Sequence, residues 1–308
     1  MESVGRGDTV GVDVQLCRET GQGDEMQSVK DDAGDQAPWP RNRDGSGQGV
    51  LLVILGEFVW RSMPYVWSST LIAALDAIGI SESATRKAIF RADQTGLIAL
   101  ERHGRRKRCS LTEKADAMFD DGNRRVFGFE GERLDWDRRW LVVTASVPES
   151  QRRLRHYLKS RFAWRGMGSP APGIWITPHT DTPIGRILEQ AGSETAFASF
   201  IGSFGPVGLE SDMVRAAWDI PQLETRYRNF VAHFEKLAPA AGAESFSAYV
   251  QLIQAWRAFP FLDPRLPSRF LPQPWIGRSA AAFLRDRRKI WKLAAQDFWT
   301  ELCDSNLP

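Results

Sequence analysis

Residues 81–96 carry their apolar side chains at the spacing of an amphipathic α-helix. One narrow face collects small or apolar side chains, at Thr85, Ala88, Ile89 and Ala92. Ser81 suits the N-cap position, and Gly96 suits the end of such a helix. The opposite face exposes Ser83, Arg86, Lys87, Phe90 and Arg91. The pattern therefore predicts a helix with one buried face and one basic face.

The chain changes period after Gly96, from the spacing of a helix to that of short strands. Apolar residues at Ile98 and Leu100, and again at Cys109 and Leu111, predict two strands joined by a tight turn. Five cations lie on or beside this turn: Arg102, Arg105, Arg106, Lys107 and Arg108. In winged-helix domains a helix enters the major groove of DNA, and a basic hairpin holds phosphates or reaches the minor groove. The alternative is a solvated charge run on an ordinary hairpin, but the order of helix, glycine and basic hairpin favours DNA binding.

Helical spacing also surrounds this segment. Apolar residues recur with a helical period at Leu51, Leu52, Leu55, Val59 and Trp60. A second helix is expected from a serine cap at Ser68 or Ser69 to Ile78, and a further helix from Glu113 to about Arg125. Together these elements predict a winged helix-turn-helix DNA-binding domain over residues 48–126.

Short apolar strands alternate with a helix in the middle of the chain. The strands are expected at 140–147, 173–178 and 196–204, with a helix at 149–162 between the first two. That helix turns Arg152, Arg153, Arg155 and Lys159 outward. The order predicts a central ferredoxin-like α+β domain over residues 136–212, with a role in dimerisation.

The remainder, residues 213–308, is predicted to be a mostly helical C-terminal domain, where we expect effector binding. Helices are expected over the apolar face that begins at Leu223, over 244–258, and over 277–302. The proline-rich segment 259–275 is studded with aromatic residues, so a packed connector is expected there. The last helix carries its apolar residues at Phe283, Leu284, Ile290, Leu293, Phe298 and Leu302. The fold class is therefore α+β.

The composition becomes informative when charges are counted separately for each part of the chain. With 308 residues, 43% hydrophobic and 25% charged, the chain is an ordinary globular protein. Its net charge of +2 conceals an acidic start, since residues 1–49 hold five basic and ten acidic residues. Residues 1–47 are predicted to be a disordered acidic tail, because they hold too little apolar surface to fold. Residues 82–108 hold eight basic and three acidic residues, which places positive charge where DNA is expected.

Several other function classes find no support in the residues. The three cysteines lack metal-binding spacing, and the four histidines are scattered, so neither a metal nor a cofactor is expected. No catalytic or nucleotide-binding motif occurs, so the chain is not expected to be an enzyme. The longest early apolar run stops at Glu57 and no secretory signal precedes it, so we expect a cytoplasmic protein without membrane contact.

The motifs together resemble the PaaX family of bacterial transcriptional repressors of phenylacetate catabolism. The resemblance rests on ISESATRKAIFRADQTGLI, RHGRRKRCSLT, RRWLVVTASVPESQRRLRHYLKSRF, GIWITP, AWDIPQLETRYRNF and FPFLDPRLPSRFLPQPWIGRSAAAFL. It implies a winged helix, a ferredoxin-like domain similar to a CRISPR-adaptation nuclease subunit, and a helical C-terminal domain. It also implies homodimers that leave DNA when they bind an aryl-CoA thioester. Departures are Ala92, Cys109 in place of a wing aromatic, and the first 47 residues.

The leading hypothesis is therefore a homodimeric repressor of an aromatic-compound catabolic operon. It is expected to bind an inverted-repeat operator and to be released by an aryl-CoA thioester such as phenylacetyl-CoA. The alternative is a metal-dependent nuclease that uses the ferredoxin-like domain, although its first strand, TASVPES, lacks the aspartate that binds the metal in such nucleases. Effector residues stay unassigned. Trp175 and Trp218 are the tryptophans to inspect, and cations for a CoA group are available at Arg226, Arg228, Arg285, Arg287 and Arg288.

Overall fold

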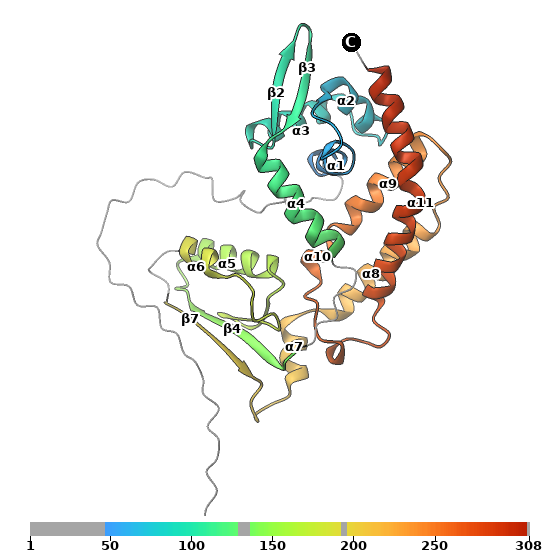
Figure 1. Ribbon diagram of the computed structural model, residues 1–308. Coiled ribbons are helices and arrows are strands. Elements are labelled where there is room, and N and C mark those ends of the chain that lie inside the picture. The colour runs from blue at the N-terminus through green and yellow to red at the C-terminus, as the bar shows by residue number, and fades with distance from the viewer. Residues whose placement is uncertain (1–46, 129–135, 192–195, 307–308) are drawn as a thin grey trace, which may run out of the picture. The chain divides into compact units, whose positions relative to one another are not determined.

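The computed structural model describes residues 47–128, 136–191 and 196–306, and it combines helices with two antiparallel sheets (Figure 1). The contacts divide these residues into two compact units. The central unit comprises 136–191, 196–224 and 261–275. The terminal unit comprises 47–128, 225–260 and 276–306. The predicted acidic tail, residues 1–47, lies almost wholly outside the described residues.

The first part of the terminal unit contains the helices and the hairpin predicted from the hydrophobic pattern, and also a short strand, β1, that the pattern did not predict. These are α1 (Gly47–Ile54), which continues as the π-helical η1 (Leu55–Val59), β1 (Val66–Trp67), α2 (Ser68–Asp76), α3 (Glu82–Gln94), β2 (Ile98–His103), β3 (Arg106–Leu111) and α4 (Glu113–Phe127). The strands form a three-stranded sheet in the order β1-β3-β2. The predicted serine cap of the second helix is wrong. Ser68 is already the first helical residue, and Trp67 takes the N-cap position without a side-chain hydrogen bond.

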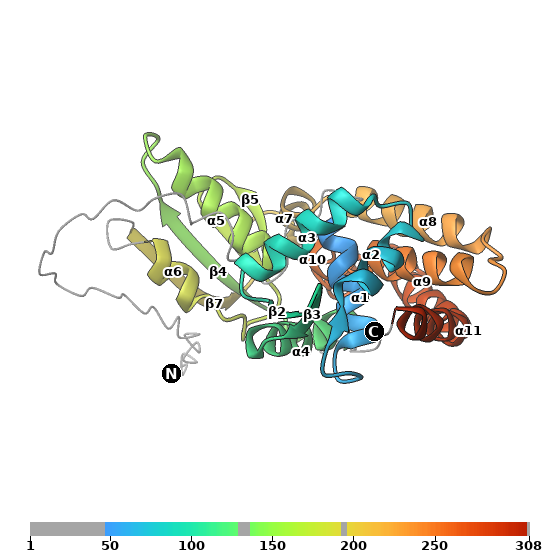
Figure 2. The same ribbon diagram turned by 90° about the horizontal axis from the view of Figure 1, so that it is seen from above.

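The C-terminal part of the chain adds further helices (Figures 1 and 2). They are α8 (Ile220–Glu235), α9 (Ala243–Trp256), α10 (Phe259–Leu262) and α11 (Ile276–Ser305). Helix α9 contacts both α1 and α11. The ring centre of Phe58 lies 5.2 Å from that of Phe246 and 5.4 Å from that of Trp299. These aromatic contacts make the first and last helices parts of one hydrophobic core.

Helix α11 does not bury all the apolar residues of its sequence pattern. Ile290 and Leu293 are exposed, and the buried side is formed instead by Trp291, Ala295 and Trp299.

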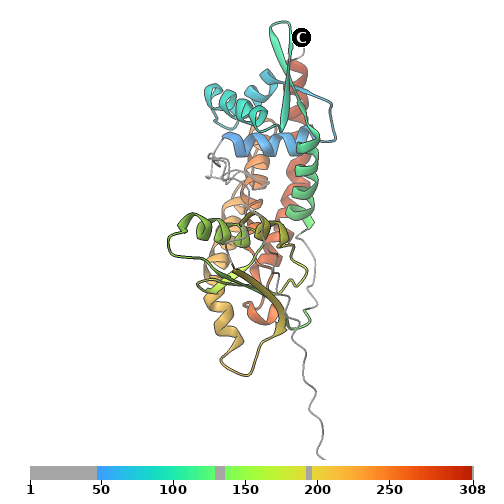
Figure 3. The same cartoon turned by 90° about the vertical axis from the view of Figure 1, so that its left-hand side faces the viewer.

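The central unit contains a four-stranded sheet with two helices on one face (Figures 1 and 3). Its elements are β4 (Arg139–Ser146), α5 (Arg152–Trp164), β5 (Gly168–Ala171), β6 (Ile174–Thr177), α6 (Gly185–Ala191), β7 (Ala196–Ser203) and α7 (Glu210–Ala217). The strand order is β5-β6-β4-β7, and all neighbouring pairs are antiparallel. Helix α5 begins at Arg152, later than predicted, because Pro148 and the turn after it precede the helix.

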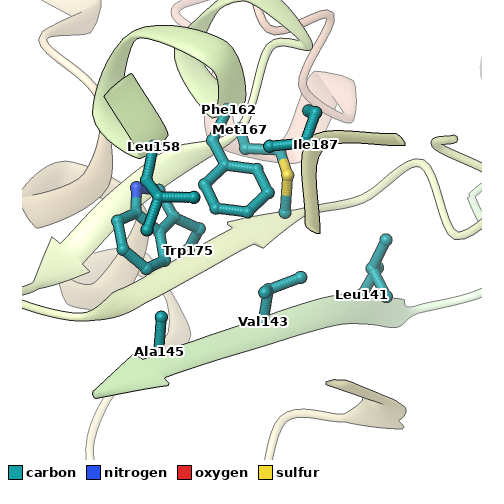
Figure 4. Close-up of a cluster of buried hydrophobic side chains, with 8 residues drawn as sticks. All are labelled: Leu141, Val143, Ala145, Leu158, Phe162, Met167, Trp175 and Ile187. Carbon is teal, nitrogen blue, oxygen red and sulfur yellow. The ribbon is translucent and has the colours of Figure 1, made fainter. Parts of the chain in front are cut away.

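The core of this unit lies between the sheet and α5. Leu141, Val143 and Ala145 point from β4 toward Leu158 and Phe162 of α5 (Figure 4). Met167, Trp175 and Ile187 complete the cluster. The outward residues of α5 are exposed as predicted, because they lie on the helix face that points away from these buried residues.

The two compact units do not coincide with the domain division expected from the sequence. Helix α7, part of which falls in the expected C-terminal domain, packs on β5 of the central unit. The connector 261–275, which includes the short helix η3 (Ser268–Phe270), also belongs to the central unit. The domain boundaries expected from the sequence at residues 126, 212 and 213 stay predictions.

Among the described helices, none combines the length and apolar character needed to cross a bilayer. Nor do three His, Cys, Asp or Glu side chains of the described residues gather as a metal site.

Candidate nucleic-acid interface

Helix α3 has a defined start and end, and one of its faces is buried. The Ser81 side chain accepts a hydrogen bond from the Ala84 backbone N–H at 3.4 Å, which caps the first turn. At the other end Gly96 adopts φ +67°, a left-handed conformation that suits glycine. The buried face packs against α1 and α2. It consists of Thr85, Ala88, Ile89 and Ala92, as the sequence pattern predicts.

The opposite face of α3 is exposed along its length. It presents Ser83, Arg86, Lys87, Phe90 and Arg91. Phe90 is 59% exposed in the middle of this basic surface, an unusual place for an aromatic ring without a partner. Arg86 is anchored on its own helix, since its guanidinium lies 2.6 Å from the Glu82 carboxylate. Lys87 and Arg91 have no carboxylate partner within the described ranges.

The β2–β3 hairpin stands beside α3 and projects from the helices (Figure 1). Its two-residue loop, Gly104 and Arg105, joins strands that pair from Ile98↔Leu111 to His103↔Arg106. At the base, one face is apolar and includes the buried Ile98 and Cys109. Burial raises the pKa of the Cys109 thiol to about 12, so this thiol stays protonated. The buried base fixes the direction of the exposed tip.

Two cations face each other across the tip of this hairpin. Arg102 pairs directly with Lys107 in the strand register, and both side chains are exposed. Like charges directly opposite each other destabilise a strand pair. No acidic residue of the described chain lies between them to compensate. The tip therefore holds positive charge that no acidic residue of the described chain compensates. An anionic partner bound there would relieve the repulsion.

Two other cations of the hairpin, Arg106 and Arg108, have partners outside the turn. The Arg108 guanidinium donates two hydrogen bonds to the Glu101 carboxylate, at 2.8 and 2.6 Å. These bonds, with a smaller contribution from His103, hold the pKa of Glu101 below its usual range. Arg106 donates to the backbone oxygen of Asn306 at 3.0 Å, just beyond the end of α11. The five cations of the predicted site thus fall into two groups. Arg106 and Arg108 are held by partners outside the turn, whereas Arg102, Arg105 and Lys107 have no carboxylate partner within the described residues. Arg102 donates only to the Gly104 backbone oxygen of the turn itself, at 3.0 Å.

A buried polar cluster fastens α1 to the C-terminal helices below this surface. Glu57, on the π-helical turn η1, accepts hydrogen bonds from the Tyr249 hydroxyl and from Arg288 Nη2, the latter at 3.2 Å. Lys292 Nζ lies 3.8 Å from the same carboxylate. Arg288 also stacks on the ring of Phe127 at the end of α4, 3.8 Å from its centre. Arg288, one of the cations suggested for a CoA phosphate, is therefore occupied within the protein.

Sequence reasoning did not find this cluster, because Glu57 and Arg288 are 231 residues apart. The only local signal was the charge of Glu57, which interrupts an otherwise apolar run. A second buried cation, Arg257, donates to the Gly49 backbone oxygen at 2.9 Å, and burial lowers its pKa to about 10. Both contacts tie the first helix to distant segments.

Comparison with known proteins accounts for most of the chain. Residues 46–115 match the family of PaaX-like proteins, residues 133–214 match its central Cas2-like domain, and residues 218–301 match its C-terminal domain. The three matches occur in order along one chain. The chain belongs to the PaaX family.

Relatives of this PaaX-family chain include a curated protein and a solved structure. The transcriptional repressor PaaX of Escherichia coli K12 is 24% identical over 248 residues, which cover 76% of this chain and 77% of the repressor. An uncharacterised protein, Rv0674 from Mycobacterium tuberculosis, superposes with a TM-score of 0.55. It is 18% identical, and the match covers 83% of this chain and 98% of that one. This second likeness concerns the fold alone.

Proposed function

We propose that this protein is a DNA-binding transcriptional repressor. The observation that carries the proposal is the uncompensated Arg102–Lys107 pair at the tip of a hairpin that stands beside the exposed basic face of α3. DNA phosphates are the anions that such a surface holds, and base edges in the major groove are read by exposed helix side chains. The curated relative is a transcriptional repressor, which agrees with this assignment.

The DNA-binding segment is a winged helix-turn-helix in this proposal. The helices α1, α2 and α3 followed by the β2–β3 hairpin support it, because this order places a helix and a basic wing on one surface. Helix α3 enters the major groove with Arg86, Lys87 and Arg91 toward the base edges. Ser83 and Phe90 contact the sugar-phosphate backbone or a thymine methyl group. The wing then holds the flanking phosphates.

The central unit forms a homodimer in this proposal. The order β4-α5-β5-β6-α6-β7 supports a ferredoxin-like assignment. One sheet face is covered by α5 and α6, whereas the other exposes Phe200 by 38% beside the half-buried Val142, Thr144 and Ala198. A second copy packed on this open face would bury these residues. A twofold dimer of this kind requires an inverted-repeat operator.

The proposed effector is an aryl-CoA thioester, and phenylacetyl-CoA is the first one to test. The proposed target is an operon for the catabolism of aromatic compounds, and the protein is proposed to act in the cytoplasm. Support comes from membership in the PaaX family. A ligand that releases DNA must bind the DNA-bound protein more weakly, by the same factor by which it weakens DNA binding.

A non-enzymatic role fits this proposal better than nuclease activity. Strand β4 ends at Ala145 and Ser146, without a carboxylate for a metal ion. No observation favours the nuclease as a second candidate function.

A gel-shift series with the protein's own promoter region tests the proposal. We expect a specific complex that survives excess random DNA and weakens steeply with salt, because phosphate contacts release counterions. Equal affinity for promoter and random duplexes at every salt concentration would overturn it.

A further inference from the structure

The central unit contains an open cavity of about 1100 Å³ beside the edge strand β5. All of its lining residues belong to this unit. Its lining comes from one side of α5, the β5–β6 hairpin, the end of β4 and the residues after it, and the stretches 217–219 and 261–264. Sites for small organic ligands usually have volumes of about 300–1,000 Å³, so this cavity accommodates an extended ligand.

Aromatic side chains form part of the apolar lining of the cavity, and two of them are fixed in place. Trp218 lies so close to β5 that a Cβ atom added at Gly168 would come within 2.4 Å of its ring. Only glycine at position 168 permits this contact. On another wall, Phe261 stacks on Trp164 with ring centres 3.8 Å apart. Trp175 and Trp218, the two tryptophans singled out in the sequence, both line this cavity.

The basic helix α5 supplies two cations to the polar part of the cavity. From 152 to 165 this segment has no acidic residue and six basic ones, at Arg152, Arg153, Arg155, Lys159, Arg161 and Arg165. Arg155 and Lys159 line the cavity one helical turn apart, and within the described ranges neither has a carboxylate partner. Like charges at this spacing destabilise a helix. Two carboxylates, Glu149 and Asp219, also line the cavity. Asp219 accepts a hydrogen bond from the Gln222 backbone N–H.

We infer that this cavity binds a ligand that joins a flat aromatic group to a flexible anionic arm. The aromatic group packs against the half-buried ring of Trp218, and the arm lies along Arg155 and Lys159. This inference rests on the proposed function, since it gives the effector a site. It places that site in the central unit, whereas the sequence pointed to the C-terminal helices.

Calorimetry on the full chain tests the inference, with phenylacetyl-CoA, CoA and phenylacetate as probes. We expect the thioester to bind more tightly than either part alone, because only the thioester fills both ends of the cavity. The double variant Arg155→Glu, Lys159→Glu should weaken thioester binding by about tenfold or more, the scale of losing charge-assisted hydrogen bonds. The matched variant Arg152→Glu, Arg153→Glu reverses two charges on the same helix outside the cavity, and should change binding less than about threefold.

A second pair of variants tests the apolar end without touching charge. Ala163 is exposed on α5 and lines the cavity, so Ala163→Trp should obstruct the ligand. Ala216→Trp adds the same ring at an exposed position outside the cavity and should leave binding unchanged. Unchanged melting temperatures identify the variants that fold normally.

The outcomes separate this inference from the repressor assignment. If the thioester releases operator DNA but the cavity variants bind it like the wild type, the effector sits elsewhere and the inference fails alone. If CoA binds as tightly as the thioester, the aromatic site is wrong. If charge reversal on α5 weakens operator binding and spares thioester binding, the basic helix is a nucleic-acid surface, which also overturns the inference. Absence of thioester binding by the wild type overturns both the inference and the proposed effector, while promoter binding still tests the repressor.

Discussion

Arg288 Nη2 lies 3.2 Å from a carboxylate oxygen of Glu57. A residue of the last helix therefore neutralises a buried charge on η1, the continuation of the first helix. Only 9% of the Glu57 side chain is exposed. The Tyr249 hydroxyl donates to the same carboxylate, and burial raises the pKa of Tyr249 well above its usual value, so the donor keeps its proton. The helices beneath α3 are therefore held by contacts from the C-terminal end of the chain.

Arg288→Ala should destabilise the terminal unit by about 2–4 kcal/mol, because removal of one partner leaves a buried carboxylate poorly compensated. Lys292 and Tyr249 remain, which keeps the expected loss at the lower end of that range. Denaturant unfolding followed by circular dichroism measures the change. The control Lys289→Ala removes an exposed cation from the same helix and should stay within about 0.5 kcal/mol of the wild type. Equal stability of the two variants would contradict the role of the Glu57 cluster.

The elements that the sequence predicted are those whose own residues specify them. Helix α3 has its cap, its apolar face and its terminal glycine within sixteen residues, so local rules suffice. Strand β5 was missed because its sequence, GSPA, has little strand propensity and owes its conformation to β6 and Trp218. The Glu57–Arg288 pair and the cavity beside β5 join distant segments, and no periodicity along the chain encodes such contacts.

The wing should supply affinity rather than specificity, and Arg102 and Lys107 should supply most of it. The double variant Arg102→Ala, Lys107→Ala should lower the slope of log K against log salt by about 0.9 for each phosphate that it no longer neutralises. It should change the stability of the hairpin little, because it removes both a repulsive cross-strand pair and the hydrogen bond from Arg102 to the Gly104 backbone oxygen. Gel shifts over a range of salt concentrations, with thermal melting, measure both effects.

Arg108→Ala is the matched comparison, since Arg108 is bound to Glu101 and is only 31% exposed. Its loss should change the salt slope less than the loss of either tip cation. A double tip variant with an unchanged slope would remove the wing from the DNA interface.

The exposed face of α3 should supply sequence readout. Arginine that bonds a guanine edge in a bidentate manner contributes about 1–3 kcal/mol of discrimination. Arg86→Ala should therefore lower affinity for the operator by about thirtyfold, the middle of that range, and leave binding to random DNA nearly intact. Competition gel shifts with both duplexes measure the ratio. Equal losses on the two duplexes would assign Arg86 to phosphates instead.

The thiol of Cys109 should resist alkylation in the folded protein. Burial, aided by the charge of Asp93, raises its pKa from 9 to about 12, so almost no thiolate forms at pH 8. The same shift lowers the free energy of unfolding only above pH 9, because there the thiol of the unfolded chain ionises and that of the folded protein does not. Mass spectrometry after iodoacetamide treatment, with and without urea, measures the protection. Rapid labelling without urea would show that the base of the hairpin opens readily.

The open face of the central sheet should form the dimer interface. Phe200 is 38% exposed on β7, where a second copy would cover it, so Phe200→Glu should place an unpaired charge in the contact and produce monomers. Val207→Glu is the matched control, because Val207 is an exposed apolar residue in the loop after β7. Sedimentation at micromolar concentration measures the oligomeric state. We expect a dimer for the wild type and the control, a monomer for Phe200→Glu, and weaker operator binding by that monomer because it reads a single half-site. A wild-type monomer, or a Phe200→Glu dimer of unchanged stability, would place the interface elsewhere.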